Sequence, residues 1–225
     1  MQRLELSSQD GGVLASAAKV LLAGGVAIFP TDTVYGIGAL PRYSEALNRI
    51  YEMKDRPLGM PLPLLLSDIS QVGTVSSFES ESLRTLATAF WPGPLTLVLP
   101  DAVEASNNFV AQDGTIAVRS PDHGFIQSLC KVVGPIAATS ANLHGEPTPL
   151  RISGMPKAFE AVDLMIDGGE CAYGSASTIL DLSKERVEVL REGPITKDSI
   201  LSINRSLSVF IVKSISASPY KKIQI

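Results

Sequence analysis

The chain has 225 residues, of which 45% are hydrophobic and 19% charged, and its formal net charge is −4. This length and apolar content suit one large domain with a sizeable core, and the acidic balance does not indicate a protein held to nucleic acid by a strongly basic surface. The longest apolar run, residues 20–30, is too short to span a bilayer, and the first residues do not resemble a secretory leader. We therefore expect a cytoplasmic protein that does not enter a membrane.

Apolar spacing predicts helices and strands that alternate along most of the chain. From Val13 to Leu22 apolar residues recur every three or four positions, which is typical of an amphipathic helix, and Gly24 and Gly25 end it. Ser44 is predicted to cap a second helix that includes Tyr51, and further helices are expected at 78–90 and around 125–132. Short apolar runs predict strands at residues 26–29, 62–66, 95–99, 115–118, 135–138, 164–166, 178–182 and 187–190.

This alternation predicts an α/β fold with a twisted, open, mixed sheet flanked by helices. The last two predicted strands are close enough in sequence to form an antiparallel hairpin. Residues 1–195 show no change in composition that would mark a boundary, so we expect one domain there. Residues 101–114 are predicted to be a surface loop. Residues 196–225 are predicted to be a C-terminal extension and no separate domain, with an edge strand near 207–215 and a frayed end.

The segment Phe29–Leu40 is the most informative part of the sequence. Pro30 has no N–H to donate and ends the preceding strand. Three small polar residues, Thr31 to Thr33, then lie just past the carboxyl end of a strand, where open α/β sheets bind their ligands, and the hydroxyl of Tyr35 follows. The alternative is an ordinary strand-to-turn corner, because Pro, Thr, Asp and Gly are common turn residues.

Two further pairs of polar residues could hold a nucleotide. Lys54 and Arg56 are two positions apart, so in an extended loop both side chains would lie on one side and suit phosphate groups. The alternative is a solvated helix end, which the residues alone favour. Ser140 and Asn142 follow a predicted strand and could bind a phosphate, a ribose or an adenine edge, or could cap a turn.

The other candidate site residues are two arginines, the histidines and the two cysteines. Arg119, after a predicted strand, could hold a carboxylate in a bidentate pair or form a weak surface ion pair. Arg191 by itself would be a charge at a strand end. His123 is expected to be a structural hydrogen-bonding residue rather than a base. Two histidines, no acidic cluster, and the distant Cys130 and Cys171 predict no protein-bound metal and buried free thiols.

Six motifs occur in a fixed order along the chain: Pro-Thr-Asp-Thr-Val-Tyr-Gly (30–36), Lys-Asp-Arg-Pro (54–57), Trp-Pro-Gly-Pro-Leu-Thr (91–96), Thr-Ile-Ala-Val-Arg-Ser-Pro-Asp-His (115–123), Thr-Ser-Ala-Asn (139–142) and Ser-Thr-Ile-Leu-Asp (177–181). Each alone is a weak signal, but the ordered series is specific. From about Val13 to Gly193 the chain resembles the YrdC-like family, the threonylcarbamoyl-AMP synthases.

The resemblance implies a YrdC-like fold and an enzyme, a nucleotidyltransferase, that joins L-threonine, bicarbonate and ATP. The products would be pyrophosphate and threonylcarbamoyl-adenylate, the donor for a modified adenosine in tRNA. Mg²⁺ would be carried with ATP and not by the protein. Downstream partners would be the threonylcarbamoyl transferase machinery that acts on tRNA, and weak direct RNA binding is compatible with this role.

The resemblance also implies roles for individual residues. Lys54 and Arg56 match the nucleotide-site motif of the family, and we expect them to act in catalysis by placing cations against phosphate charge. Ala176 stands where the family usually has proline, which predicts a less rigid loop before Ser177. The threonine and carbamate are expected to meet Thr33, Tyr35, Arg119 and Ser177. The nucleotide is expected to meet Lys54, Arg56, Thr115, Ser140, Asn142 and Arg191.

Two alternatives to this function remain at the level of sequence. One is a non-catalytic RNA-binding module of the same fold, and the other is a related carbamoyl-transfer enzyme with a different acceptor. Threonine and serine differ by one methyl group, whose packing contributes only about 1–3 kcal/mol, so the sequence does not separate these two substrates.

Overall fold

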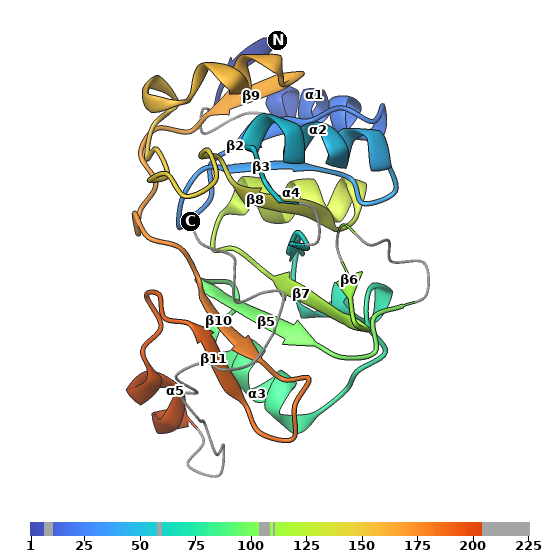
Figure 1. Ribbon diagram of the computed structural model, residues 1–225, viewed down its shortest axis with the longest axis vertical. Coiled ribbons are helices and arrows are strands. Elements are labelled where there is room, and N and C mark those ends of the chain that lie inside the picture. The colour runs from blue at the N-terminus through green and yellow to red at the C-terminus, as the bar shows by residue number, and fades with distance from the viewer. Residues whose placement is uncertain (7–10, 58–59, 104–108, 110, 204–225) are drawn as a thin grey trace.

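A computed structural model describes residues 1–6, 11–57, 60–103, 109 and 111–203. Within these residues one mixed sheet runs the length of the molecule, with helices packed along it (Figure 1). The edge strand predicted at 207–215 and the middle of the loop predicted at 101–114 lie outside the described residues. No helix in the described part of the chain is long and apolar enough to cross a membrane.

The sheet has eleven strands among the described residues, in the order β1-β9-β2-β3-β8-β4-β7-β5-β10-β11, with β6 paired to β7. Neighbours β1–β9, β2–β9, β4–β7 and β5–β10 are parallel and the other pairs antiparallel, so the predicted mixed α/β sheet is confirmed. The strands are β1 (Gln2–Glu5), β2 (Ala27–Phe29), β3 (Gly36–Ala39), β4 (Leu64–Leu65), β5 (Leu95–Leu99), β6 (Ala111–Gln112), β7 (Thr115–Arg119), β8 (Ile136–Ser140), β9 (Leu164–Asp167), β10 (Thr178–Asp181) and β11 (Glu188–Arg191).

All four predicted helices are present, and a fifth follows residue 195. Ser44 is the first residue of its helix and not the cap, because Tyr43 occupies the cap position without a side-chain hydrogen bond. The helix predicted from residue 78 begins three residues later, where the Ser80 hydroxyl accepts the N–H of Leu83. The α-helices are α1 (Gly11–Leu22), α2 (Ser44–Lys54), α3 (Glu81–Phe90), α4 (Gly124–Val133) and α5 (Lys197–Ile203), and the 3₁₀ helices are η1 (Ile69–Thr74), η2 (Ile152–Gly154) and η3 (Lys157–Ala161).

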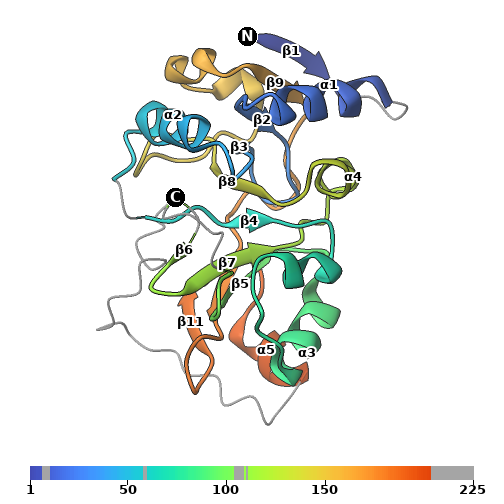
Figure 2. The ribbon, with the colours of Figure 1, turned by 90° about the vertical axis from the view of Figure 1, so that its right-hand side faces the viewer.

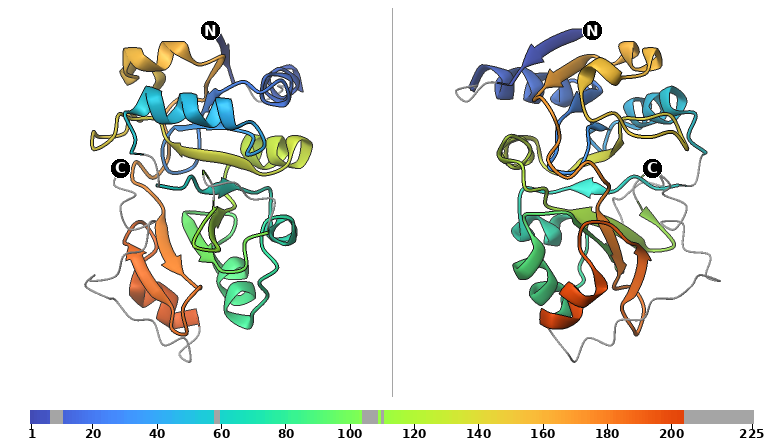
Figure 3. Two further views of the ribbon diagram at one scale, coloured as in Figure 1. Left: turned by 45° about the vertical axis from the view of Figure 1, so that its right-hand side comes forward. Right: turned by 90° about the vertical axis from the view of Figure 1, so that its left-hand side faces the viewer.

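Helices cover both faces of the sheet because its central strands are apolar on both faces. In β2, Ala27 and Phe29 pack in the cluster that contains α1 and α4, whereas Ile28 between them packs in the cluster that contains α2. Figure 2 shows α2 on one side of these strands and α1 and α4 on the other. The hairpin β10–β11 and α5 lie at the end of the molecule opposite β1 (Figure 3). Ile200 of α5 is fully buried in the main cluster, so residues just past 195 belong to the same core.

The structure contains strands that apolar spacing did not predict. β1 is an exposed edge strand, β6 lies inside the predicted loop, and β3 contains two glycines that carry no strand propensity. Gly38 of β3 lies between β2 and β8, where an added Cβ would be 2.8 Å from the Ala137 carbonyl oxygen. Close backbone approach therefore explains glycine at this position.

We expect Gly38→Ala to lower the free energy of unfolding by about 1–3 kcal/mol, because the methyl group overpacks the sheet against backbone. Gly124→Ala is the matched control, since an added Cβ there meets nothing within 4 Å. Urea denaturation of both variants measures the difference. Equal stability of the two variants would contradict the crowding at β3.

Candidate active site

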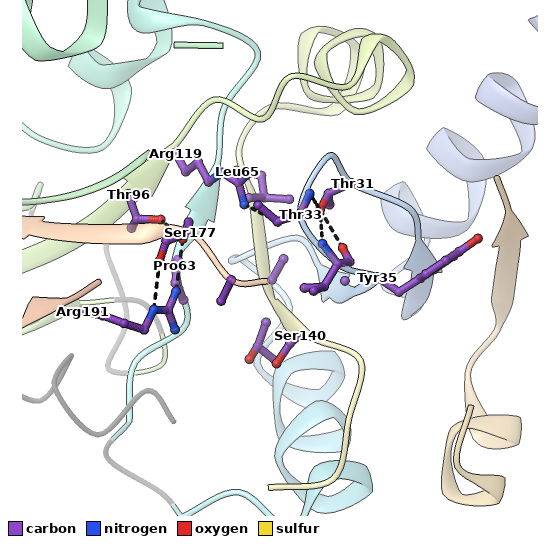
Figure 4. A pocket seen from close by; sticks show the side chains of 15 residues that line it. Thr31, Thr33, Tyr35, Pro63, Leu65, Thr96, Arg119, Ser140, Ser177 and Arg191 are labelled. Carbon is purple, nitrogen blue, oxygen red and sulfur yellow. Dashed lines mark hydrogen bonds between the residues drawn. The ribbon is translucent and has the colours of Figure 1, made fainter. Parts of the chain in front are cut away.

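A cavity of about 80 Å³ lies in the middle of the sheet, where β4, β7 and β8 meet the β2–β3 loop and the start of β10. Six of the ten predicted site residues line it, and Figure 4 shows their side chains: Thr33, Tyr35, Arg119, Ser140, Ser177 and Arg191. The remaining lining residues include apolar Pro63 and Leu65 and the hydroxyl-bearing Thr31 and Thr96. The motifs, distant in sequence, therefore converge on one cavity.

Arg119 is buried at the end of β7 and is held at three of its nitrogens. Nε donates to the Gly93 carbonyl at 2.9 Å, one terminal nitrogen to the Thr33 hydroxyl at 2.8 Å and the other to Asp32 at 2.6 Å. Both side chains of the ion pair with Asp32 are less than a tenth exposed, at 7% and 4%. Burial lowers the pKa of Arg119, and the Asp32 carboxylate partly offsets this effect. The alternative of a surface ion pair is wrong.

The β2–β3 loop is held in place by its own threonines and by a second loop. The Thr31 hydroxyl donates to the Val34 carbonyl at 2.6 Å and contacts the Thr33 hydroxyl at 3.1 Å. The N–H groups of Tyr173 and Gly174 donate to the carbonyls of Asp32 and Thr33, at 2.9 and 3.0 Å. The loop is thus an ordered turn and a wall of the cavity at the same time, so the two sequence interpretations of this segment are not exclusive.

Tyr35 faces the cavity with its main chain and not with its hydroxyl. The ring is fully buried and points away from the other cavity side chains (Figure 4). Its hydroxyl donates to the Gly169 carbonyl at 2.8 Å and accepts the Gly168 N–H at 3.0 Å. Burial raises the pKa of Tyr35 to about 12. A contact between a substrate and this hydroxyl is therefore inconsistent with the structure, and any role of Tyr35 at the threonine end lies in its main chain.

Ser177 and Arg191 form the opposite wall. The Ser177 hydroxyl lies 2.7 Å from that of Thr96 and accepts a guanidinium N–H of Arg191 at 3.1 Å. Gly193 permits this arrangement, because an added Cβ would strike the Ala176 carbonyl and lie 2.6 Å from the Thr178 nitrogen. Burial and the positive charge of Arg119 lower the pKa of Arg191 to about 10. Two guanidinium groups close enough to affect each other make this cavity suited to anions.

Lys54 lies directly behind Ser140 and not in an extended loop. It is the last residue of α2 and is 2% exposed. Nζ donates to the carbonyls of Ser140 and Asn142, both at 2.5 Å, and to the Asn142 side-chain oxygen at 3.2 Å. Burial and the charge of Arg56 lower the pKa of Lys54 to about 7. The three oxygen acceptors favour the protonated amine. Because Lys54 is buried against these oxygens, the interpretation of a solvated helix end is wrong.

Asn142 is engaged within the protein as well. Its side-chain oxygen accepts from Ser140 at 2.5 Å, and its amide nitrogen donates to the carbonyls of Leu143 and Glu146 at 3.0 and 2.5 Å. Its side chain thus shapes the turn, which was one of the two alternatives, and it also supports Ser140. The predicted contact of Asn142 with a nucleotide stays a prediction, and Ser140 is the member of this pair that lines the cavity.

Arg56 and Thr115 lie outside the cavity lining. Arg56 is buried and donates to the carbonyls of Met60 and Pro61 at 3.2 and 3.4 Å. Thr115 is the first residue of β7 and Arg119 the last, so the two are separated by the length of the strand. The parallel register of β4 with β7, extended backwards from Leu64, brings Thr115 to the level of Pro61. Any contact of Arg56 and Thr115 with a nucleotide would therefore be made outside the cavity, near residues 60–61. This role stays a prediction.

Asp32 and Thr96 are among the residues of the site that were not in the sequence-predicted set. Asp32 is the counter-ion of Arg119, and the signal for it was present, because a buried arginine requires an anion. Thr96, in the predicted β5, pairs with Ser177.

His123 lies near Asp32. The charge of Asp32 raises the pKa of the His123 imidazole, although burial has the larger effect and lowers it. His123 Nδ1 is buried without a hydrogen-bond partner in the described structure, so the predicted structural hydrogen bond is not made by that nitrogen.

Within the described residues, no three His, Cys, Asp or Glu side chains are grouped so that they could hold a metal ion. Cys130 and Cys171 are buried free thiols, and the prediction of buried free thiols is confirmed. Burial raises the pKa of Cys130 to about 12, so this thiol is protonated at neutral pH. The chemistry of the cavity is that of guanidinium and hydroxyl groups.

A family model, Sua5_yciO_yrdC, described as "Telomere recombination", matches residues 19–193. The chain belongs to the Sua5/YciO/YrdC family. It is 39% identical over 202 residues to a Bacillus subtilis protein named threonylcarbamoyl-AMP synthase, covering 88% of this chain and 58% of that protein.

Two solved structures of the family resemble this one. The structure of Pyrococcus abyssi Sua5 complexed with L-threonine has a TM-score of 0.83 and 32% identity, covering 93% of this chain and 62% of that one. Escherichia coli YciO has a TM-score of 0.79 and 25% identity, covering 89% and 98%. The predicted YrdC-like fold is confirmed. The chain spans about three-fifths of the B. subtilis and P. abyssi proteins but nearly all of YciO.

We expect Lys54→Met to lower the free energy of unfolding by about 1–3 kcal/mol, because the oxygens of Ser140 and Asn142 lose a buried donor. If Lys54 lay in an exposed polar loop, the substitution would not lower the free energy of unfolding. Lys19→Met, at an exposed position on α1, is the control and should change stability by less than about 0.5 kcal/mol. Equal denaturation midpoints for the two variants would contradict the bracing role of Lys54.

Proposed function

We propose that this protein is a threonylcarbamoyl-AMP synthase, which condenses L-threonine, bicarbonate and ATP to threonylcarbamoyl-adenylate and pyrophosphate. The observation that carries the proposal is the cavity in which Arg119 and Arg191 face hydroxyl groups, in a chain of the Sua5/YciO/YrdC family. The name of the B. subtilis relative and the L-threonine in the P. abyssi Sua5 structure support the reaction and the amino-acid substrate.

Arg119 is the group that best suits the carboxylate of threonine. Its three hydrogen bonds use three of the five guanidinium N–H groups, which leaves one on each terminal nitrogen for a ligand. A guanidinium N–H donates a charge-assisted hydrogen bond to a carboxylate, so these two groups could hold its oxygens. Thr33 holds one of these nitrogens, and Leu65, directly beside Arg119 in the β4–β7 register, is an apolar wall of the cavity against which a methyl group can pack.

Arg191 and the hydroxyls of Ser140 and Ser177 would then face the carbamate and the α-phosphate. Lys54 and Asn142 support Ser140 from behind, and Arg56 fixes the segment before β4. Mg²⁺ would enter with the phosphates of ATP. It would supply charge neutralisation as pyrophosphate leaves.

The reaction does not require a nucleophile on the protein. Bicarbonate takes up a proton and releases water to give CO₂. The amine nitrogen of threonine then forms a bond to the carbon of CO₂ and loses a proton, which gives a carbamate. A carbamate oxygen then attacks the α-phosphorus of ATP, and the bond from that phosphorus to the bridging oxygen of pyrophosphate breaks. The cavity would accelerate these steps by orientation and by cations placed in advance against the developing phosphate charge.

The product would be consumed by a threonylcarbamoyl transferase machinery that modifies tRNA, and the protein would act in the cytoplasm. A non-catalytic RNA-binding module is not favoured, because the similar curated protein from B. subtilis carries the name of an enzyme. A different amine acceptor is likewise not favoured, because the family includes a Sua5 structure complexed with L-threonine.

We expect pyrophosphate release from ATP to require L-threonine, bicarbonate and Mg²⁺ together. A coupled pyrophosphate assay in which each component is omitted in turn measures this requirement. Equal release without threonine would contradict the proposed substrate, and no turnover combined with salt-sensitive RNA binding would favour the binding module.

We expect Arg119→Lys to raise the KM for threonine about ten- to hundredfold and to leave the KM for ATP nearly unchanged. Lysine keeps a positive charge beside Asp32 but loses the guanidinium fork that holds a carboxylate. Titration of each substrate against the variant measures the two constants. Arg151→Lys is the control, because Arg151 forms an exposed ion pair with Glu170. A larger change in the KM for ATP than for threonine would place Arg119 at the nucleotide end instead.

A further inference from the structure

Asp32 is a buried carboxylate next to the cavity that does not line it. The residue is 5% exposed, and one side-chain oxygen lies 2.6 Å from Arg119. The other oxygen, Oδ2, is buried without a hydrogen-bond partner among the described residues. Its neighbours Thr31 and Thr33 face the cavity, whereas Asp32 does not. A ligand in the cavity would therefore meet Arg119 without meeting Asp32.

The ion pair depends on a single hydrogen-bonded contact. The other two groups that hold Arg119, the Gly93 carbonyl and the Thr33 hydroxyl, are neutral. Asp32 alone supplies a hydrogen-bonded negative charge, and a buried carboxylate stays ionised only when a cation or several donors compensate it. Each member of the pair thus compensates the buried charge of the other. The three contacts to different nitrogens also fix the plane of the guanidinium.

We propose that Asp32 is the positioning residue of the amino-acid end of the cavity: it holds the guanidinium of Arg119 in an orientation in which the remaining terminal N–H groups are available to a substrate carboxylate. The inference rests on the proposed function, in which threonine supplies that carboxylate. Asp32 acts through Arg119 and makes no contact with the substrate.

The structure separates this role from a role in loop folding. The hydrogen bond between Asp32 and the neighbouring loop is made by the main chain of Asp32, whose carbonyl accepts the Tyr173 N–H at 2.9 Å. This bond survives a change of side chain, as does the bond between Thr33 and Gly174. Substitution of the side chain therefore removes the orientation of Arg119 while the loop keeps its main-chain partners.

The test compares Asp32→Ala and Asp32→Asn with a control at Asp181, a second buried aspartate. Asp181 is 2% exposed, accepts the N–H and hydroxyl of Ser183, and lies on β10 outside the cavity lining. The measurements are KM for threonine, KM for ATP and kcat from pyrophosphate release, L-threonine binding by calorimetry, and the melting temperature of each variant.

We expect Asp32→Ala to raise the KM for threonine about tenfold or more without a matching change in the KM for ATP. Asp32→Asn, which keeps an oxygen acceptor for Arg119, should recover part of the loss. Asp181→Ala should lower the melting temperature and leave both KM values unchanged. If Asp32→Ala does not fold, Asp32→Asn carries the test, and its dissociation constant for L-threonine should still exceed that of the wild type.

Wild-type threonine affinity in a folded Asp32 variant would overturn the inference, since a merely structural aspartate would behave like Asp181. Equal losses for threonine and ATP would overturn it as well. Failure of the proposed function has a different result, because the wild-type protein itself would then neither bind L-threonine nor require it for pyrophosphate release. The wild-type measurement thus separates the two failures.

Discussion

The buried ion pair between Arg119 and Asp32 is the interaction on which the geometry of the cavity depends. A guanidinium and a carboxylate removed from water are stable only in contact with each other and with further hydrogen bonds. Arg119 comes from the end of β7 and Asp32 from the β2–β3 loop, so the requirement to pair ties two distant parts of the sheet together. The Gly93 carbonyl adds a third segment, the one before β5. One charge pair thereby fixes the relative position of three chain segments.

Buried cations shape the rest of the site in the same way. Lys54 and Arg56 donate to main-chain carbonyls of residues 140, 142, 60 and 61, so the charges at the end of α2 hold the turn after β8 beside the cavity and the segment that leads into β4. Such a site is organised before a ligand binds, and its cations need little rearrangement when phosphate charge develops. This arrangement agrees with a reaction that proceeds by orientation and electrostatics and needs no covalent intermediate on the protein.

The sequence predicted the site better as a set than residue by residue. Six predicted residues converge on one cavity, since the motifs lie at the ends of apolar strands that meet there. Individual orientations were not predictable, because they depend on pairing partners far away in the chain. The Tyr35 hydroxyl turns toward Gly168 and Gly169, and Lys54 is buried against Ser140 although its local sequence is that of a polar helix end. Local spacing contains no information about contacts between residues that are 86 to 134 positions apart.

The sequence by itself determined the α/β class, the core helices, most strands and the family, because these follow from apolar periodicity and from motif order, both of which are local properties of the chain. Only the tertiary structure decided the glycine-containing β3, the charge partner of Arg119, and the division between residues that face the cavity and residues that brace it. These depend on which strands lie next to each other and on where water is excluded. A buried charge such as Arg119 must find its counter-ion in three dimensions, and Asp32 lies 87 positions away in sequence.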